Sequence, residues 1–282
     1  MAAETECPEK VQVAQGPPIL STPTIRKTRR ILIPPTPAAA ERRETALRPA
    51  IFRPPYKPIY ASVKGVAEFL FAALLLVLAA PVLAVVALAV KLTSRGPVLY
   101  TQVRVGKGGR PFTLYKIRSM VHDCEKASGV QWSRPGDPRV TRVGAFLRKT
   151  HLDELPQLWN VLRGDMSLVG PRPERPEFTP ALERAIPHYR DRIAVRPGVT
   201  GLAQVQLPPD TDLASVRLKL IYDIYYIHNR GLWMDLRLVA CTAVHMLGVP
   251  YAVLRSLFGM PGPDAVNAAY QEHSLPRAQI QA

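Results

Sequence analysis

Residues 69–90 read FLFAALLLVLAAPVLAVVALAV, a run of 22 residues without one polar side chain and with a single proline, Pro81. As a straight helix this run would extend about 33 Å, close to the roughly 30 Å of a bilayer's hydrocarbon core. A helix buried in a protein core is the alternative, but such a helix normally keeps a polar face. We therefore predict that this segment inserts into a membrane.

The charges on either side of this run bear on whether it crosses the membrane. Lysine and arginine are enriched on the cytoplasmic side of membrane helices. Here both flanks are basic, because Lys64 precedes the run and Lys91 and Arg95 follow it. Pro81 would also remove a backbone hydrogen bond and bend the helix near its middle. We therefore prefer a re-entrant helix to one that spans the membrane. Such a helix would bend at Pro81 and return to the face from which it entered.

The composition limits the classes of partner. The chain has 282 residues, 47% of them hydrophobic, and a formal net charge of +15. This excess indicates an acidic partner, such as anionic lipid, nucleic acid or a phosphorylated substrate. We expect no nucleic-acid partner, since no aromatic-basic motif accompanies the charge and such a partner would not account for the apolar run. Three widely spaced cysteines, Cys7, Cys124 and Cys241, indicate neither a disulfide framework nor a zinc site.

The chain divides by composition into four parts. Residues 1–60 are rich in proline and arginine and are predicted to be a disordered leader, either a solvated tail or a segment lying against anionic lipid. Residues 61–93 contain the membrane helix. Residues 94–250 form the main domain, and residues 251–282 are expected to be a loose C-terminal tail.

The main domain begins with a predicted β-hairpin. Two β-rich runs, residues 98–105 and 111–117, flank a five-residue loop with three glycines. Alternation of side chains places Lys116 on one strand face, from which it can reach a ligand. The glycine loop fits no P-loop spacing, so we interpret it as structural.

Most of the remaining sequence has helical spacing, and the predicted fold class is α+β, mainly α. Two amphipathic runs near the C-terminus, residues 216–228 and 232–247, carry apolar and aromatic residues at helical intervals. The second run is too short and too polar to span a membrane. It could lie in the membrane interface or serve as an ordinary core helix.

Two adjacent carboxylates, Asp153 and Glu154, open the stretch LDELPQLWNVLRGDMSLVGPRP at residues 152–173. With Asp153 as N-cap, Pro156 would fall at the third helical position and break no hydrogen bond. The carboxylates would then lie at the positive end of a helix, which attracts phosphate. The simpler alternative is that Asp153 only caps this helix and Glu154 complements its dipole.

The basic residues around this pair favour a functional site. Arg148 precedes the carboxylates, Arg172 lies in the rigid Gly-Pro-Arg-Pro loop at 170–173, and Arg196 precedes another Pro-Gly pair. Arginine binds phosphate oxygens bidentately, and a rigid loop loses little entropy on binding. A carboxylate in such surroundings can serve as a metal ligand or as a nucleophile toward phosphorus. Two carboxylates without a histidine or cysteine cluster suit Mg²⁺ better than zinc.

Nine ordered motifs resemble one known family. They are SRGP (94–97), QVRVGK (102–107), YKIRSM (115–120), DPRVTRVG (137–144), LR (147–148), the 152–173 stretch, RPGVTGLAQ (196–204), YD (222–223) and YI (226–227). Over roughly residues 60–247 the chain resembles the bacterial sugar transferases, also called monotopic phosphoglycosyl transferases or polyprenyl-phosphate sugar-1-phosphate transferases. The family usually begins its membrane segment with a Lys-Arg-x-x-Asp pattern, where this chain keeps Lys64 and has Gly65 and Glu68 at the other two positions.

The resemblance implies a reaction. The aspartate at 153 would attack the β-phosphate of a UDP-sugar, release UMP and hold the sugar phosphate covalently, with Glu154 completing the dyad. A polyprenyl phosphate, normally undecaprenyl phosphate, would then take the sugar phosphate. The resemblance also implies Mg²⁺ held by Asp153 and Glu154. Phosphate oxygens would be held by Lys116, Arg148, Arg172 and Arg196.

The resemblance further implies a place and a role. The domain would be catalytic and lie on the cytoplasmic face of the bacterial inner membrane, against anionic lipids, with Pro81 at the bend of a re-entrant helix. The reaction would begin assembly of an exopolysaccharide, capsule, O-antigen or glycoprotein glycan. A noncatalytic membrane-surface scaffold and a single-step reaction without a covalent intermediate are the alternatives. The sequence leaves open which sugar is used and whether the protein forms a homo-oligomer.

Overall fold

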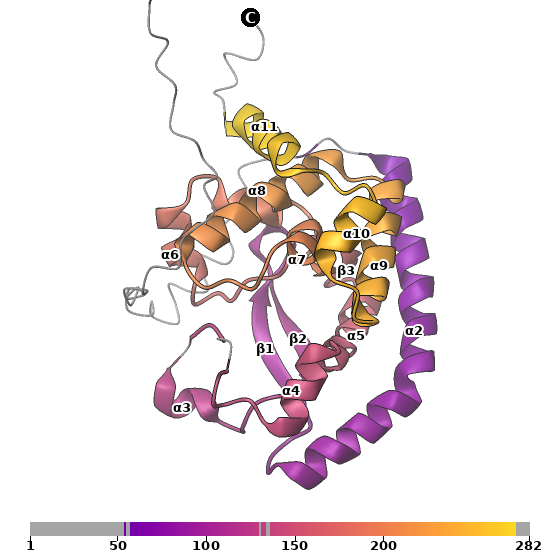
Figure 1. The fold of residues 1–282 in the computed structure, drawn as a ribbon, viewed down its shortest axis with the longest axis vertical. Helices are drawn as coiled ribbons and strands as arrows, with labels where there is room; N and C mark the ends of the chain where they lie inside the picture. Colours follow the sequence, from indigo (N-terminus) through magenta and orange to yellow (C-terminus); the bar gives the residue numbers. More distant parts are fainter. Residues whose placement is uncertain (1–53, 55–56, 130, 134–135, 275–282) are drawn as a thin grey trace, which may run out of the picture. The chain divides into compact units, whose positions relative to one another are not determined.

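Figure 1 shows the fold as a computed structural model, which describes residues 54, 57–129, 131–133 and 136–274. The chain divides into two units, Met1–Leu32 and Ile33–Ala282, and every described residue belongs to the second unit. The predicted leader over residues 1–60 therefore lies outside the described residues, apart from Pro54 and residues 57–60. Residues 58–60 already form the start of the first described helix.

The described elements are mainly helical, which confirms the predicted fold class. In chain order they are α2 (Pro58–Thr93), β1 (Leu99–Val105), η1 (Lys107–Gly109), β2 (Pro111–Ile117), α3 (Cys124–Ser128), α4 (Arg142–Lys149), η2 (Leu152–Glu154), α5 (Gln157–Leu162), β3 (Ser167–Val169), α6 (Thr179–Ala185), η3 (Tyr189–Ala194), β4 (Gly198–Thr200), α7 (Leu202–Gln206), α8 (Leu213–Asn229), α9 (Leu232–Met246), α10 (Tyr251–Leu257) and α11 (Pro263–Ser274). The labels η1 to η3 denote 3₁₀ turns.

Helix α2 contains the whole apolar run. It is one bent helix of 36 residues with Pro81 inside it, and among the described residues it is the one helix long and apolar enough to cross a membrane (Figure 1). Only 11% of its most apolar 18-residue window is buried by the rest of the protein. A core helix would be mostly buried, so this exposed apolar surface fits membrane association instead.

Polar contacts near its N-terminus fasten α2 to the main domain. The Glu68 carboxylate accepts hydrogen bonds from the Ser167 hydroxyl at 2.7 Å and from the backbone N–H groups of Leu168 and Val169 at 3.0 and 3.3 Å. Lys64 Nζ lies 2.7 Å from both Glu68 Oε1 and Asp235 Oδ2, and so joins α2 to α9. Glu68 is therefore a principal contact between α2 and β3.

Replacing Glu68 by glutamine should lower the free energy of unfolding by about 2 kcal/mol, because half-buried Lys64 loses a charged partner and Gln cannot accept all of the same hydrogen bonds. Thermal or denaturant unfolding of the purified protein measures this change. Lys91→Gln, at an exposed site near the other end of α2, is the control and should change stability by less than about 0.5 kcal/mol. Equal stability of wild type and Glu68→Gln would show that the Glu68 contacts do not hold α2.

Two small sheets position the loops of the main domain. Strands β1 and β2 form the predicted antiparallel hairpin, with Gln102 opposite Leu114. Strands β3 and β4 form a parallel pair that the sequence analysis did not predict. Gly170, just after β3, and Gly198, in β4, let the two backbones approach closely. A Cβ atom on Gly198 would lie 2.1 Å from the Gly170 nitrogen. The 170–173 loop is thus held directly against the 196–201 segment.

Helices α8 and α9 match the two predicted amphipathic runs and pack against the core. One face of α9 buries Leu238 and Cys241, while Leu232, Trp233 and Leu236 on the other face are exposed. The packed face confirms the core-helix alternative for that face, and the exposed face, which includes Trp233, leaves the membrane-interface alternative a prediction.

The prediction of a loose C-terminal tail over 251–282 is wrong for residues 251–274, which form α10 and α11. Leu254 in α10 and Val266 in α11 are completely buried. These two helices were not predicted because they are short, with 7 and 12 residues, and a short helix carries few turns of apolar spacing. Residues 275–282 lie outside the described part of the chain.

Candidate active site

The two carboxylates lie in a turn between two helices. Helix α4 ends at Lys149, His151 takes a left-handed conformation with φ 56°, and residues 152–154 form the 3₁₀ turn η2. Helix α5 begins only at Gln157, with Pro156 as its N-cap. The prediction that Asp153 is the N-cap is therefore wrong. A left-handed histidine gives no sequence signal, because glycine or asparagine usually occupies such positions.

Glu154 binds two cations from other parts of the chain. Its Oε1 lies 2.6 Å from Lys116 Nζ in β2 and 2.6 Å from Arg172 Nη2 in the 170–173 loop. Burial raises the pKa of Glu154, but the positive charges of Arg172 and Lys116 outweigh it and hold that pKa well below its ordinary value of 4.5. Glu154 is therefore ionised at neutral pH and holds Lys116 and Arg172 together.

Asp153 immediately precedes Glu154 in the chain but has a different environment. Its side chain is buried, with the residue 6% exposed, and within the described residues no hydrogen bond or ion pair involves its carboxylate. Burial raises the pKa of Asp153 above its ordinary value of 3.8, while the nearby charge of Lys116 opposes this shift. The structure thus leaves one carboxylate, Asp153, available to a ligand.

Arg148 lies close enough to influence Asp153 without pairing with it. Its guanidinium donates to the Ser119 hydroxyl at 2.9 Å and to the Ser133 hydroxyl at 2.7 Å. Its positive charge is among those that lower the pKa of Asp153. These two serine contacts fix the guanidinium beside the site.

Arg172 is held by a group that the sequence analysis missed. Arg192 Nη2 donates to the Arg172 carbonyl oxygen at 2.9 Å and lies 2.8 Å from Asp223 Oδ2. The Arg172 side chain keeps 42% of its surface exposed, so its guanidinium can bind a ligand as well as Glu154. The only sequence signal for this support was the Tyr-Asp motif at 222–223, because its aspartate, Asp223, pairs with Arg192.

Arg196 does not join this cluster. No hydrogen bond or ion pair among the described residues links it to Asp153 or Glu154, and it instead lines a hollow of about 550 Å³ together with Lys107 and Arg110. The glycine loop at 106–110, interpreted from sequence as structural only, thus contributes two cations to this hollow. Three basic side chains around one hollow can bind an anionic group.

The sequence between residues 59 and 248 matches the model of the family described as bacterial sugar transferase. The chain belongs to the bacterial sugar transferase family. The matched region contains both carboxylates, Lys116, and the three arginines at 148, 172 and 196, and it ends just after α9. This match confirms the resemblance drawn from the nine motifs.

Three similar proteins have names that state an activity. The UDP-N-acetylgalactosamine-undecaprenyl-phosphate N-acetylgalactosaminephosphotransferase of Aeromonas hydrophila is 47% identical over 182 residues, which cover 64% of this chain and 43% of that protein. The UDP-glucose:undecaprenyl-phosphate glucose-1-phosphate transferase of Xanthomonas campestris pv. campestris is 44% identical, and the match covers 60% of this chain and 35% of that protein. The protein of the same name from Caulobacter vibrioides is 48% identical, and the match covers 65% of this chain and 69% of that protein. The matches therefore span less than half the length of the Aeromonas and Xanthomonas proteins.

Proposed function

We propose that this bacterial sugar transferase moves a sugar 1-phosphate from a UDP-sugar to a polyprenyl phosphate and releases UMP. The observation that carries this proposal is the buried Asp153 carboxylate, which has no partner among the described residues and lies beside an ionised Glu154 that holds two cations. The names of the three relatives all include undecaprenyl phosphate as acceptor. The reaction would begin the assembly of a surface polysaccharide or another glycan.

In the first proposed step an oxygen of Asp153 attacks the β-phosphorus of the UDP-sugar. The bond from this phosphorus to the bridging oxygen breaks, UMP leaves with that oxygen, and the sugar phosphate becomes an acyl phosphate on Asp153. Negative charge develops on the departing phosphate. The partly exposed guanidinium of Arg172 and the serine-bound guanidinium of Arg148 are suited to stabilise it.

In the second proposed step a phosphate oxygen of the polyprenyl phosphate attacks the same phosphorus. The bond to Asp153 breaks, the carboxylate is regenerated, and a polyprenyl diphosphate sugar leaves. The exposed apolar surface of α2 supports a lipid acceptor, because such surface is stable in the membrane where the polyprenyl chain resides. Trapping labelled sugar phosphate on the protein in the absence of lipid would distinguish this route from a single-step reaction.

Mg²⁺ fits this site through Asp153. In sites of this kind Mg²⁺ takes one or two carboxylates, with substrate phosphates and waters completing its coordination. Glu154 is less suited than predicted from sequence, because its Oε1 already binds Lys116 and Arg172. The ion would neutralise part of the negative charge of the substrate diphosphate. Arg196, with Lys107 and Arg110, would hold a more distant anionic group of a substrate in their hollow.

We also propose that α2 is re-entrant and that the catalytic domain lies on the cytoplasmic face of the inner membrane. Both ends of α2 are bound to the same domain: Lys64 contacts Asp235 near the N-terminal end, and Arg118 donates to the Ser94 carbonyl at 2.9 Å just after the C-terminal end. A full span would place these ends on opposite faces of the bilayer. The bent, proline-containing helix supports a path that begins and ends on one face.

The purified full chain should release UMP when given undecaprenyl phosphate and its proper UDP-sugar, and it should form a lipid-linked sugar diphosphate. A panel that includes UDP-glucose and UDP-N-acetylgalactosamine, the donors in the relatives' names, would identify the sugar. The scaffold alternative predicts no UMP release with any donor. Failure of a broad panel, with Mg²⁺ and lipid present, would therefore overturn the proposed activity.

The pH dependence of UMP release should report the ionisation of Asp153. Attack requires the carboxylate, and burial raises the pKa of Asp153, so activity should be lost on acidification at a pH above the ordinary value of 3.8. Glu154, with its lowered pKa, remains ionised over this range. Arg148→Gln removes a positive charge that lowers the pKa of Asp153, and should move the acid limb to higher pH. If the loss of activity on acidification occurs at the same pH in Arg148→Gln as in wild type, the titrating group is not Asp153.

A further inference from the structure

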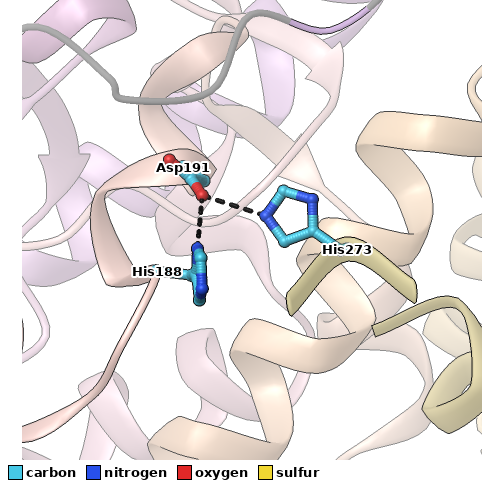
Figure 2. A group of neighbouring side chains, drawn as sticks. All are labelled: His188, Asp191 and His273. Atoms are coloured by element: carbon cyan, nitrogen blue, oxygen red, sulfur yellow. Dashed lines mark hydrogen bonds and ion pairs between the residues drawn. The ribbon is translucent and has the colours of Figure 1, made fainter. Parts of the chain in front are cut away.

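We propose that η3 and α11 form a zinc site from His188, Asp191 and His273 (Figure 2). His188 immediately precedes η3, Asp191 lies within it, and His273 lies in α11, 82 residues beyond Asp191. One donor atom from each side chain lies within 4.8 Å of the other two. Within the described residues this is the one such group of histidine, cysteine or carboxylate donors, and it lies in elements that supply neither carboxylate of the candidate active site.

The distances between the donor atoms are close to those of a zinc site. Asp191 Oδ2 lies 3.2 Å from His188 Nδ1 and 2.9 Å from His273 Nε2, and Figure 2 shows both rings directed at this oxygen. Ligands bound tetrahedrally at about 2.0–2.1 Å from zinc lie about 3.3 Å from one another. Small side-chain movements would therefore admit the ion among the three donors.

The donor chemistry and the burial favour zinc over a hard cation. Two imidazoles and one carboxylate are typical zinc ligands, whereas Mg²⁺ and Ca²⁺ prefer oxygen ligands alone. Asp191 is 1% exposed and the His273 side chain is 5% exposed, so both are shielded from water. The His188 side chain is 36% exposed, which leaves a path for the ion and a position for a water as fourth ligand.

A fourth residue, His228 in α8, would position one of these ligands. Its Nε2 lies 2.9 Å from His273 Nδ1. When His273 Nε2 binds the ion, its proton resides on Nδ1 and can be donated to His228 Nε2. Such a hydrogen bond to the remote nitrogen fixes the tautomer and the ring orientation of a metal-bound histidine. His228 is thus a positioning residue and does not itself bind the ion.

The zinc site would connect α11 to the segment that supports Arg172. Asp191 is adjacent to Arg192, whose guanidinium donates to the Arg172 carbonyl oxygen. An ion bound by Asp191 and His273 would fasten α11 to η3 and thereby limit the movement of Arg192. The expected role is therefore structural, holding the C-terminal helix against the loop support of the candidate active site.

Zinc binding tests this inference without substrate. The purified full chain, stripped with EDTA and freed of chelator, is titrated with ZnCl₂ in competition with a chromophoric chelator. We expect one zinc per chain with a dissociation constant below about 1 µM. His188→Gln and His273→Gln should weaken binding at least about 100-fold, and His228→Gln about 10-fold. His122→Gln is the matched control, since His122 forms an exposed pair with Asp123 at 3.3 Å and belongs to no three-donor group among the described residues.

Two further measurements separate loss of the ligand from loss of the fold. Glutamine can still donate a hydrogen bond to Asp191, so metal-free His273→Gln should melt near metal-free wild type, and only the rise in melting temperature on adding zinc, on the order of 5 °C, should vanish. Co²⁺ in place of zinc should give the visible absorption of a tetrahedral site in wild type and in His122→Gln, and this absorption should be absent from His188→Gln and His273→Gln. Absence of stoichiometric binding in wild type, or unchanged binding in both ligand variants, would overturn the zinc site. Neither result depends on whether the protein transfers a sugar phosphate.

Discussion

Replacing Asp153 by asparagine is expected to lower UMP release by roughly 10³-fold or more, because a neutral amide cannot attack phosphorus as a carboxylate does. The fold should be unaffected. No hydrogen bond or ion pair among the described residues depends on this carboxylate, and its raised pKa means that the ionised form destabilises the folded state at neutral pH. The neutral amide resembles the protonated carboxyl group, so the Asp153→Asn variant should unfold at the same temperature as wild type or a higher one.

Two measurements make the Asp153 result decisive. Labelled sugar phosphate should remain on the wild-type protein when lipid is absent, and should be missing from Asp153→Asn. Asp264→Asn, at an exposed position in α11, is the matched control and should keep wild-type rates. Substantial UMP release by a well-folded Asp153→Asn protein would exclude the covalent mechanism.

Replacing Glu154 by glutamine should impair both stability and activity. The buried ammonium of Lys116 would lose its carboxylate partner, and the free energy of unfolding should fall by about 3 kcal/mol. Because Lys116 and Arg172 would no longer be held together, the rate of UMP release should fall by roughly 10²-fold. The negative charge of Glu154 also raises the pKa of Asp153, so the acid limb of the remaining activity should move to lower pH.

A double variant separates the two effects of Glu154. Removing the lysine as well, in Glu154→Gln with Lys116→Met, leaves no unpaired buried ammonium and should restore most of the lost stability without restoring activity. Glu154→Asp retains the charge on a shorter side chain and should be the most active variant at this position. If Glu154→Gln alone matched wild type in rate and stability, Glu154 would not be the residue that organises the two cations.

Several elements could be predicted from sequence because their signals are local. The run from Phe69 to Val90 contains no polar residue, so it predicted α2, and alternating residues around a glycine loop predicted the β1–β2 hairpin. Helical spacing predicted α8 and α9. The parallel pair β3–β4 was not predictable, since three-residue strands carry no periodicity and Ser167 pairs with Gly198, which lies 31 positions later.

The candidate site was predictable only in part. The adjacent carboxylates and the nearby arginines indicated that Asp153, Glu154 and Arg172 belong to a site that acts on phosphate groups. The region that matches the family contains all three residues. The separate environments of the two carboxylates could not be predicted, because they depend on which side chain faces Lys116 and Arg172 after folding. The place of Arg196 could not be predicted for the same reason, since only the folded chain brings it beside Lys107 and Arg110.

The sequence by itself determined that this chain carries a membrane-length apolar helix, two adjacent carboxylates and the motifs of the bacterial sugar transferases, because each is written in consecutive residues. Only the tertiary structure decided that Glu154 binds the cations while Asp153 is left available, that both ends of α2 join one domain, and that His273 meets Asp191. These features depend on contacts between residues far apart in the chain. Side-chain packing fixes such contacts, and a single sequence contains no local signal for them.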